Sequence, residues 1–113
     1  MQEKIGLGFG FMRLDVYRVA RELVAEVVRA EIGDGELRDQ ATRAAKSAFL
    51  NLCEGLPSNS GPMRRKFFAS ARGSAAEVAS ALDLASVLGV VTAERAERVI
   101  SLAARLSIML ARL

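Results

Sequence analysis

The chain has 113 residues, 51% of them hydrophobic, and its 16 basic and 13 acidic side chains give a net charge of +3. This length suits one domain with a single core, and the apolar content excludes an intrinsically disordered chain. There is no histidine and one cysteine, Cys53, so the sequence offers neither an internal disulfide nor the usual transition-metal ligands. We expect Cys53 to be a small packed side chain.

Residues 1–12, MQEKIGLGFGFM, are apolar and rich in glycine, and we expect a flexible segment ahead of a helical domain over residues 13–113. The apolar run is too short to span a membrane, and it has no signal-peptide cleavage pattern. We therefore expect a cytoplasmic protein with no membrane partner. The glycines also lack the preceding strand and the following helix of a nucleotide-binding loop.

Glycine and proline breakers divide the rest of the chain into four segments, and each segment repeats its apolar residues with a helical period. The first expected helix covers residues 14–31, with Asp15 in the first turn, where the helix dipole favours an acid. Its inward stripe is Val16, Ala20, Leu23, Val27 and Ala30. Its solvent-facing charged residues are Arg18, Arg21, Glu22 and Glu26.

The second expected helix begins after Asp34, a good N-cap, and runs to about residue 54. Gly55 is expected to end this helix in the left-handed conformation. A loop restricted by two prolines follows over residues 55–62. The apolar side of the helix is rich in alanine, which would let a neighbouring helix approach closely: Leu37, Ala41, Ala44, Ala48 and Leu52.

The third expected helix runs from Pro62, which suits a first turn, to about residue 88. Gly73 lies in its middle, where glycine costs about 1 kcal/mol relative to alanine. Close contact with another backbone would offset this cost, so we expect such a contact at Gly73. The seam of this helix is Phe67, Ala71, Ser74, Val78, Leu82 and Ala85.

The fourth expected helix begins at the N-cap Thr92 and runs toward residue 113. One apolar stripe has three-four spacing, and further apolar residues widen it to nearly two faces: Ala96, Val99, Ala103, Leu106, Leu110 and Leu113, with Ile100, Leu102, Ile108 and Met109. We predict an all-α fold, an antiparallel up-down four-helix bundle. The surplus apolar surface of the last helix indicates a homo-oligomer. The alternative is that this helix is the most enclosed of the four.

A file of polar residues lies along one face of the second helix: Arg43, Ser47, Asn51 and Glu54. In one interpretation these residues join polar residues of the third helix, Arg72, Ser74 and Glu77, in a partly buried network that fixes the register of the helices or of neighbouring subunits. In the other interpretation they form a recognition site in which Arg43 and Arg72 contact phosphate. We favour the network, because carboxylates beside the arginines would compete with phosphate.

Arg64, Arg65 and Lys66 form a compact basic run at the start of the third helix. Such groups bind phosphate with a strong dependence on salt, and a helix N-terminus adds attraction for anions. The alternative is an ordinary solvated basic face. Phe67 and Phe68 follow the run, and their helical spacing favours core packing over base stacking. Four further cations would extend the nucleic-acid surface in an oligomer, as would Arg112: Lys46, Arg38, Arg98 and Arg105.

Three blocks occur in order along the chain: LDVYRVARELVAEV at 14–27, RAAKSAFLNLCEG at 43–55 and RRKFFASARGSAAEVASALDLASVLG at 64–89. Together they resemble the four-helix-bundle family encoded in intervening sequences of bacterial large-subunit ribosomal RNA genes. That family includes the accessory variability proteins of diversity-generating retroelements. One departure concerns Phe49, since many relatives have a proline there that would kink the second helix.

The resemblance implies a homopentamer arranged as a barrel with a basic surface or central channel. It also implies nucleic-acid contact, because retroelement members work with a reverse transcriptase and its RNA template. No catalytic set, metal site or cofactor motif is present in the sequence, so we expect a non-enzymatic protein. The working hypothesis is a basic oligomer that binds RNA or DNA as an accessory to a reverse transcriptase or ribosomal RNA. The alternative is an oligomeric scaffold that holds a protein partner without nucleic acid.

Overall fold

A computed structural model describes residue 10 and residues 14–113. Across residues 14–113 the regular structure consists of four α-helices, with no strand: α2 (Asp15–Arg29), α3 (Gly35–Gly55), α4 (Gly61–Val87) and α5 (Ala93–Ala111). These bounds agree with the expected helices to within about two residues. The expected flexible segment at residues 1–12 lies outside the described residues, apart from Gly10.

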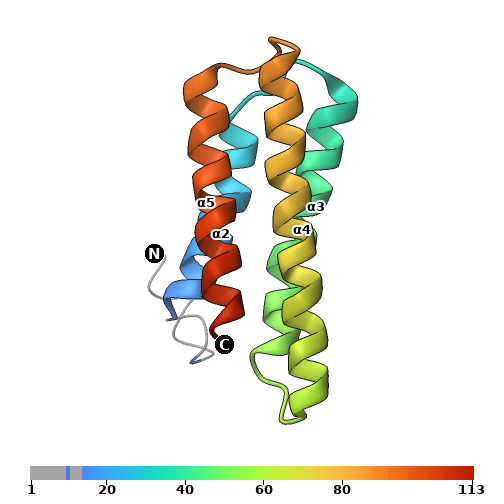
Figure 1. The fold of residues 1–113 in the computed structure, drawn as a ribbon, viewed down its shortest axis with the longest axis vertical. Helices are drawn as coiled ribbons and strands as arrows, with labels where there is room; N and C mark the ends of the chain where they lie inside the picture. Colours follow the sequence, from blue (N-terminus) through green and yellow to red (C-terminus); the bar gives the residue numbers. More distant parts are fainter. Residues whose placement is uncertain (1–9, 11–13) are drawn as a thin grey trace.

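The four helices alternate in direction along the chain, so that α2 and α4 run one way and α3 and α5 the other (Figure 1). Each helix packs against its neighbours in sequence, and α2 also packs against α5, which closes the square. The hairpin of α3 and α4 extends beyond the ends of α2 and α5 (Figure 1). This projecting part carries the basic run of the sequence.

Short-range capping explains where three of the helices begin. The side chains of Asp34, Ser60 and Thr92 accept hydrogen bonds from backbone N–H groups three residues later, at 3.0, 3.3 and 3.2 Å. Each bond satisfies a donor that the first turn leaves free. Asp34 and Thr92 are therefore confirmed as N-caps.

The expected inward stripes of α2 and α3 are buried throughout. At the centre of the bundle, Leu23, Leu52, Leu82 and Leu106 have no exposed surface. Alanines dominate the rest of the core on α3 and α4, which lets these two helices approach closely. On α4 the seam begins with Phe68, which is 5% exposed, while Phe67 is only half-buried.

Gly55 does not have the left-handed conformation that the sequence analysis expected, since that conformation occurs at Glu31 (φ 51°) and Gly89 (φ 74°). Gly55 is the last residue of α3, and a β-carbon placed on it would lie 2.6 Å from Cε1 of Phe68. The prediction was wrong about the cause: glycine is needed there because an aromatic ring of α4 packs against its α-carbon.

The close backbone contact expected at Gly73 does not occur among the described residues, because a β-carbon added there would meet nothing within 4 Å. The expectation that Glu26 faces solvent was wrong, since it is 9% exposed and lies between α2 and α5 beside Arg29 and Arg98. A charged residue beside the core stripe is tolerated here because cations from two helices contact it.

The apolar surplus of α5 is largely covered within the bundle. Ile100, Leu102 and Met109 pack against the core, whereas Ile108 and Leu113 remain 55% and 49% exposed. Most of the large exposed apolar residues lie on other segments: Leu14, Val28, Leu50, Met63, Leu84, Val87 and Leu88. α3 continues as one α-helix through Phe49. None of the described helices is long and apolar enough to cross a membrane.

Candidate nucleic-acid interface

A groove lies where α4 continues past the end of α5, and its volume is about 530 Å³. We call it the arginine groove. Arg65, Ala69 and Arg72 follow one another at helical spacing on its α4 side, and Phe68 forms part of its apolar floor. The complete lining is Gly61, Arg64, Arg65, Phe68, Ala69, Arg72, Leu110, Ala111 and Leu113.

Arg64 fixes the turn between α3 and α4. Its Nη1 donates hydrogen bonds to the backbone oxygens of Leu56, at 2.5 Å, and Gly55, at 3.2 Å. Its guanidinium carbon also lies 5.1 Å from the centroid of the Phe68 ring, in cation–π geometry. Arg64 thus caps the carbonyl end of α3, and only its remaining N–H groups face the groove.

Arg65 and Arg72 are exposed and take part in no ion pair within the described part of the chain. Lys66 is exposed as well, but it does not line the groove. The structure therefore divides the expected basic run into one structural arginine, one groove arginine and one outward lysine. Arg72, which the favoured interpretation placed in a polar network, instead joins Arg64 and Arg65 at the groove.

The other predicted cations lie apart from the arginine groove. Arg38 donates to the backbone oxygen of Ile32 at 3.1 Å, near the start of α3. Arg98 lies 3.8 Å from Glu26, and Lys46 lies on α3 among the residues that line a pocket between α2 and α3. Arg105 is exposed on α5. Their alignment with the arginine groove in an oligomer stays a prediction.

Part of the polar file of α3 does meet α4. The hydroxyl groups of Ser47 and Ser74 are 2.8 Å apart, and the side-chain amide of Asn51 donates to the backbone oxygen of Ser47 at 2.9 Å and to its hydroxyl at 3.2 Å. The remaining members of the predicted network are exposed, and none forms an ion pair among the described residues: Arg43, Glu54, Arg72 and Glu77. The buried contact is a small neutral one.

The buried charge of the bundle lies elsewhere. Arg29 Nη1 is 2.7 Å from Glu26 and 3.2 Å from Glu22. The hydrogen bond from Arg29 lowers the pKa of Glu26, and the charge of Arg98 acts in the same direction, while burial opposes both. The cluster of Glu26 with Arg29 and Arg98 was not predicted. The position of Glu26 directly before a residue of the inward stripe could have indicated that this acid is buried and paired.

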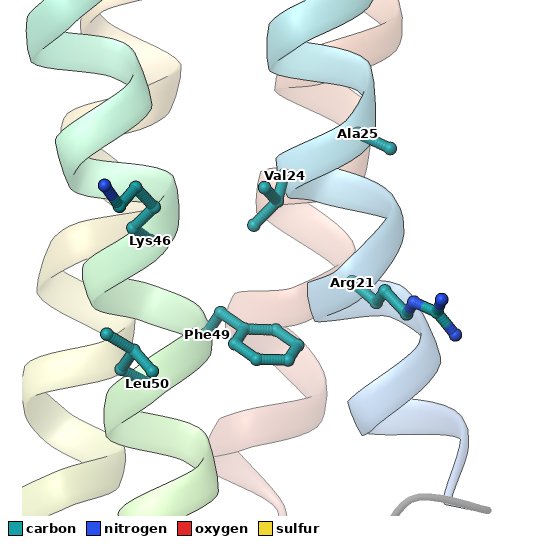
Figure 2. Close-up of a pocket in the computed structure, with 6 residues that line it drawn as sticks. All are labelled: Arg21, Val24, Ala25, Lys46, Phe49 and Leu50. Carbon is teal, nitrogen blue, oxygen red and sulfur yellow. The ribbon is translucent and has the colours of Figure 1, made fainter. Parts of the chain in front are cut away.

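A second groove, of about 400 Å³, lies between α2 and α3. We call it the α2–α3 groove. Figure 2 shows Val24 and Phe49 pointing toward one another across it, with Lys46 and Leu50 along α3. The ring of Phe49 is held at 5.3 Å from that of Tyr17. The lining is almost entirely apolar, with Arg21 and Lys46 at its margins.

The described residues hold no group of acids and cysteine able to bind a metal ion. Cys53 is half-buried, and burial, together with the charge of Glu54, raises the pKa of its thiol. Its thiolate is therefore disfavoured, which suits a packed side chain better than a nucleophile.

The family model described as 23S rRNA-intervening sequence protein matches residues 12–112, which include all four described helices and every arginine of the arginine groove. No curated protein matches the chain in sequence.

Proposed function

The chain belongs to the 23S rRNA-intervening sequence protein family, and we propose that it is a non-enzymatic homo-oligomer that binds the sugar–phosphate backbone of RNA. The observation that carries this proposal is the arginine groove, which is lined by three arginines and an apolar floor and in which Arg65 and Arg72 are exposed. Arginine suits this role because its planar fork can donate two parallel hydrogen bonds to one phosphate.

The charge around the groove supports the proposal. The two exposed arginines, Arg65 and Arg72, have no acid within ion-pair distance among the described residues, so a phosphate would not compete with a carboxylate. The groove lies at the part of the α3–α4 hairpin that projects beyond the ends of α2 and α5. Repetition of the groove around an oligomer would multiply its charge without any new contact.

The family name makes ribosomal RNA the first ligand to test. The retroelement accessory proteins that the sequence also resembles make the template RNA of a reverse transcriptase the second. Either role would place the protein in the cytoplasm. A scaffold that holds a protein partner is the alternative function, and the exposed apolar lining of the α2–α3 groove favours it.

The test is binding of a fluorescent RNA oligonucleotide across a series of salt concentrations. We expect the affinity to fall steeply with salt, because phosphate contacts release counterions. The double variant Arg65→Glu/Arg72→Glu should lower the affinity at least about tenfold and flatten the salt dependence. Arg64 is left intact in this variant because it also holds the α3–α4 turn.

Arg43→Glu is the matched control, since Arg43 is an exposed arginine of α3 outside the groove lining. It should change the affinity much less than either groove substitution. Equal losses in the control and in the double variant would show that only the overall charge matters. Absence of RNA binding at low salt, with a defined protein co-purifying instead, would overturn RNA binding in favour of the scaffold.

A further inference from the structure

The outward face of α4 carries small and acidic side chains in the C-terminal half of the helix. Gly73, Ala76 and Ser80 follow one another at three-four spacing and are all exposed, so this part of the helix has a flat surface. Glu77 and Asp83 are exposed on the same side of the helix. From residue 73 to residue 94 the chain contains no lysine or arginine. Leu84 and Val87, 47% and 76% exposed, extend this face toward the end of α4.

No described contact or backbone conformation within the chain explains why residue 73 is a glycine. A glycine in a helix interior weakens the helix, and here neither a positive φ nor a close neighbour requires it. A β-carbon at this position would meet only open space. A close approach by another molecule would explain the glycine, because a larger side chain would block that contact.

The α2–α3 groove is the complementary surface. Its lining is apolar, Leu50 projects from it with 57% exposure, and its charged members, Arg21 and Lys46, are both basic. A large side chain such as Leu50 or Phe49 fits against the part of this face that is formed by glycine, alanine and serine. The basic margins are opposite in charge to the acids of the α4 face, so the two surfaces are electrostatically complementary.

We propose that the α2–α3 groove of one copy receives the outward face of α4, residues 73–87, from a second copy. This inference rests on the homo-oligomer of the proposed function and names its interface. The 2.8 Å contact between Ser47 and Ser74 places Phe49 and Gly73 at the same height in the bundle. Two copies that lie side by side, with their bundle axes parallel, therefore bring the groove of one opposite the small residues of the other. No shift of one copy along the bundle axis is needed.

The two surfaces differ, so the contact is head-to-tail rather than two-fold. A two-fold axis through either surface would bring like charges together, basic on basic or acidic on acidic. A head-to-tail contact leaves one free groove and one free α4 face on each dimer, so further copies can add through the same contact and form a ring where the rotation between copies closes. The groove thus becomes the place where the side chains of one subunit are covered by the next.

Gly73→Leu tests the interface by filling its closest point. The mass of the wild type and of the variant would be measured by light scattering between micromolar and hundred-micromolar concentrations. The wild type should be an assembly, and the variant a single chain with undiminished helix content. Ser101→Leu, which adds the same side chain at an exposed position of α5, is the control and should leave the mass unchanged.

Charge reversal tests the direction of the contact. Lys46→Glu and Glu77→Lys should each raise the concentration at which half of the chains are assembled by about tenfold or more, since each substitution places like charges together. The double variant should recover most of this loss. A single-chain mass for the wild type would overturn the homo-oligomer itself. An assembled wild type whose mass none of these variants changes would overturn this interface alone.

Discussion

At the scale of single residues, Glu26 shows how one buried charge is stabilised. Its carboxylate accepts a hydrogen bond from Arg29 at 2.7 Å and lies 3.8 Å from Arg98 of α5, which links α2 to α5. Arg29 and Arg98 are well exposed, so the cations keep their hydration while the acid exchanges water for protein donors. The ionised form of Glu26 is therefore favoured in the folded protein, and its pKa is lowered from the ordinary value of 4.5.

This shift gives the stability of the protein a defined dependence on pH. Because the folded pKa of Glu26 lies below its unfolded value, the stabilisation is complete above the unfolded pKa and is lost as the pH falls through the folded pKa. Glu26→Gln should lower the free energy of unfolding by about 1–2 kcal/mol at neutral pH, because it removes a charge-assisted hydrogen bond.

Urea unfolding of both proteins between neutral pH and pH 3 measures the effect. The gap between wild type and Glu26→Gln should narrow as the solution becomes acidic. Glu22→Gln, at an exposed partner of the same arginine, is the matched control and should change the unfolding free energy by less than about 0.5 kcal/mol. A gap that stays constant with pH would show that Glu26 acts through packing and not through its charge.

Gly55 illustrates what a local pattern leaves out. A glycine at the end of a helical segment commonly has the left-handed conformation, and that rule gave the wrong reason here. The actual reason is the ring of Phe68, thirteen positions further along the chain and on another helix. Only the path of the intervening loop brings the two residues together, and residue spacing does not encode that path.

At the scale of the helices, local signals were sufficient for the four segments. Asp34 and Thr92 cap helices where they were expected to, and the inward stripes of α2 and α3 are buried because their spacing matches the helical period. The wide apolar surface of α5 was a weaker guide to which of its residues are exposed. A helix in a closed square contacts two neighbours and the centre, so an apolar stripe wider than one face is largely covered.

The candidate site was less predictable than the helices. The sequence marked Arg64, Arg65 and Lys66 as one unit because they are adjacent, but successive residues of a helix point about 100° apart and so have different neighbours. One signal was available for Arg64. The last turn of α3 has no basic residue of its own, so its free carbonyl groups need a donor from elsewhere in the chain.

Arg64→Ala should therefore destabilise the α3–α4 hairpin. The substitution leaves the backbone oxygens of Gly55 and Leu56 without this donor and removes the cation from the face of Phe68. We expect a loss of about 1.5–3 kcal/mol in the free energy of unfolding, as for other hydrogen bonds from charged groups. Arg65→Ala, one position later and exposed, should change it by less than about 0.5 kcal/mol.

Chemical unfolding of the two variants under identical conditions separates these outcomes. Hydrogen exchange would add the location, with faster exchange expected at the end of α3 and the start of α4 in Arg64→Ala alone. Equal stability of the two variants would mean that Arg64 is free to serve the groove as Arg65 does, and the groove would then have three arginines available to phosphate instead of two.

At the scale of the whole molecule, the bundle is one unit with two unlike surfaces. The arginine groove opens on the projecting end of the hairpin, whereas the α2–α3 groove and the outward face of α4 lie along the sides of the bundle. Assembly through the sides would leave the ends free. All the arginine grooves of a ring would then lie at one end of it, because its copies point the same way.

An assembly of this kind makes thermal stability depend on protein concentration, because binding between folded copies stabilises only the native state. For a domain of this size we expect the melting temperature of the wild type to rise on the order of 5 °C for each tenfold increase in concentration. Gly73→Leu should show no such rise, since its chains remain apart. At high dilution it should melt no lower than the wild type, because leucine favours a helix interior more than glycine does.

Differential scanning fluorimetry across two decades of concentration is sufficient for this measurement, with Ser101→Leu as the control that keeps the wild-type slope. The melting temperatures of the wild type and of Gly73→Leu should therefore move apart as the concentration increases and approach one another as it falls. A wild-type melting temperature independent of concentration, together with a single-chain mass, would leave the small acidic face of α4 uncovered in solution. Each arginine groove would then have to hold RNA with the charge of one chain only.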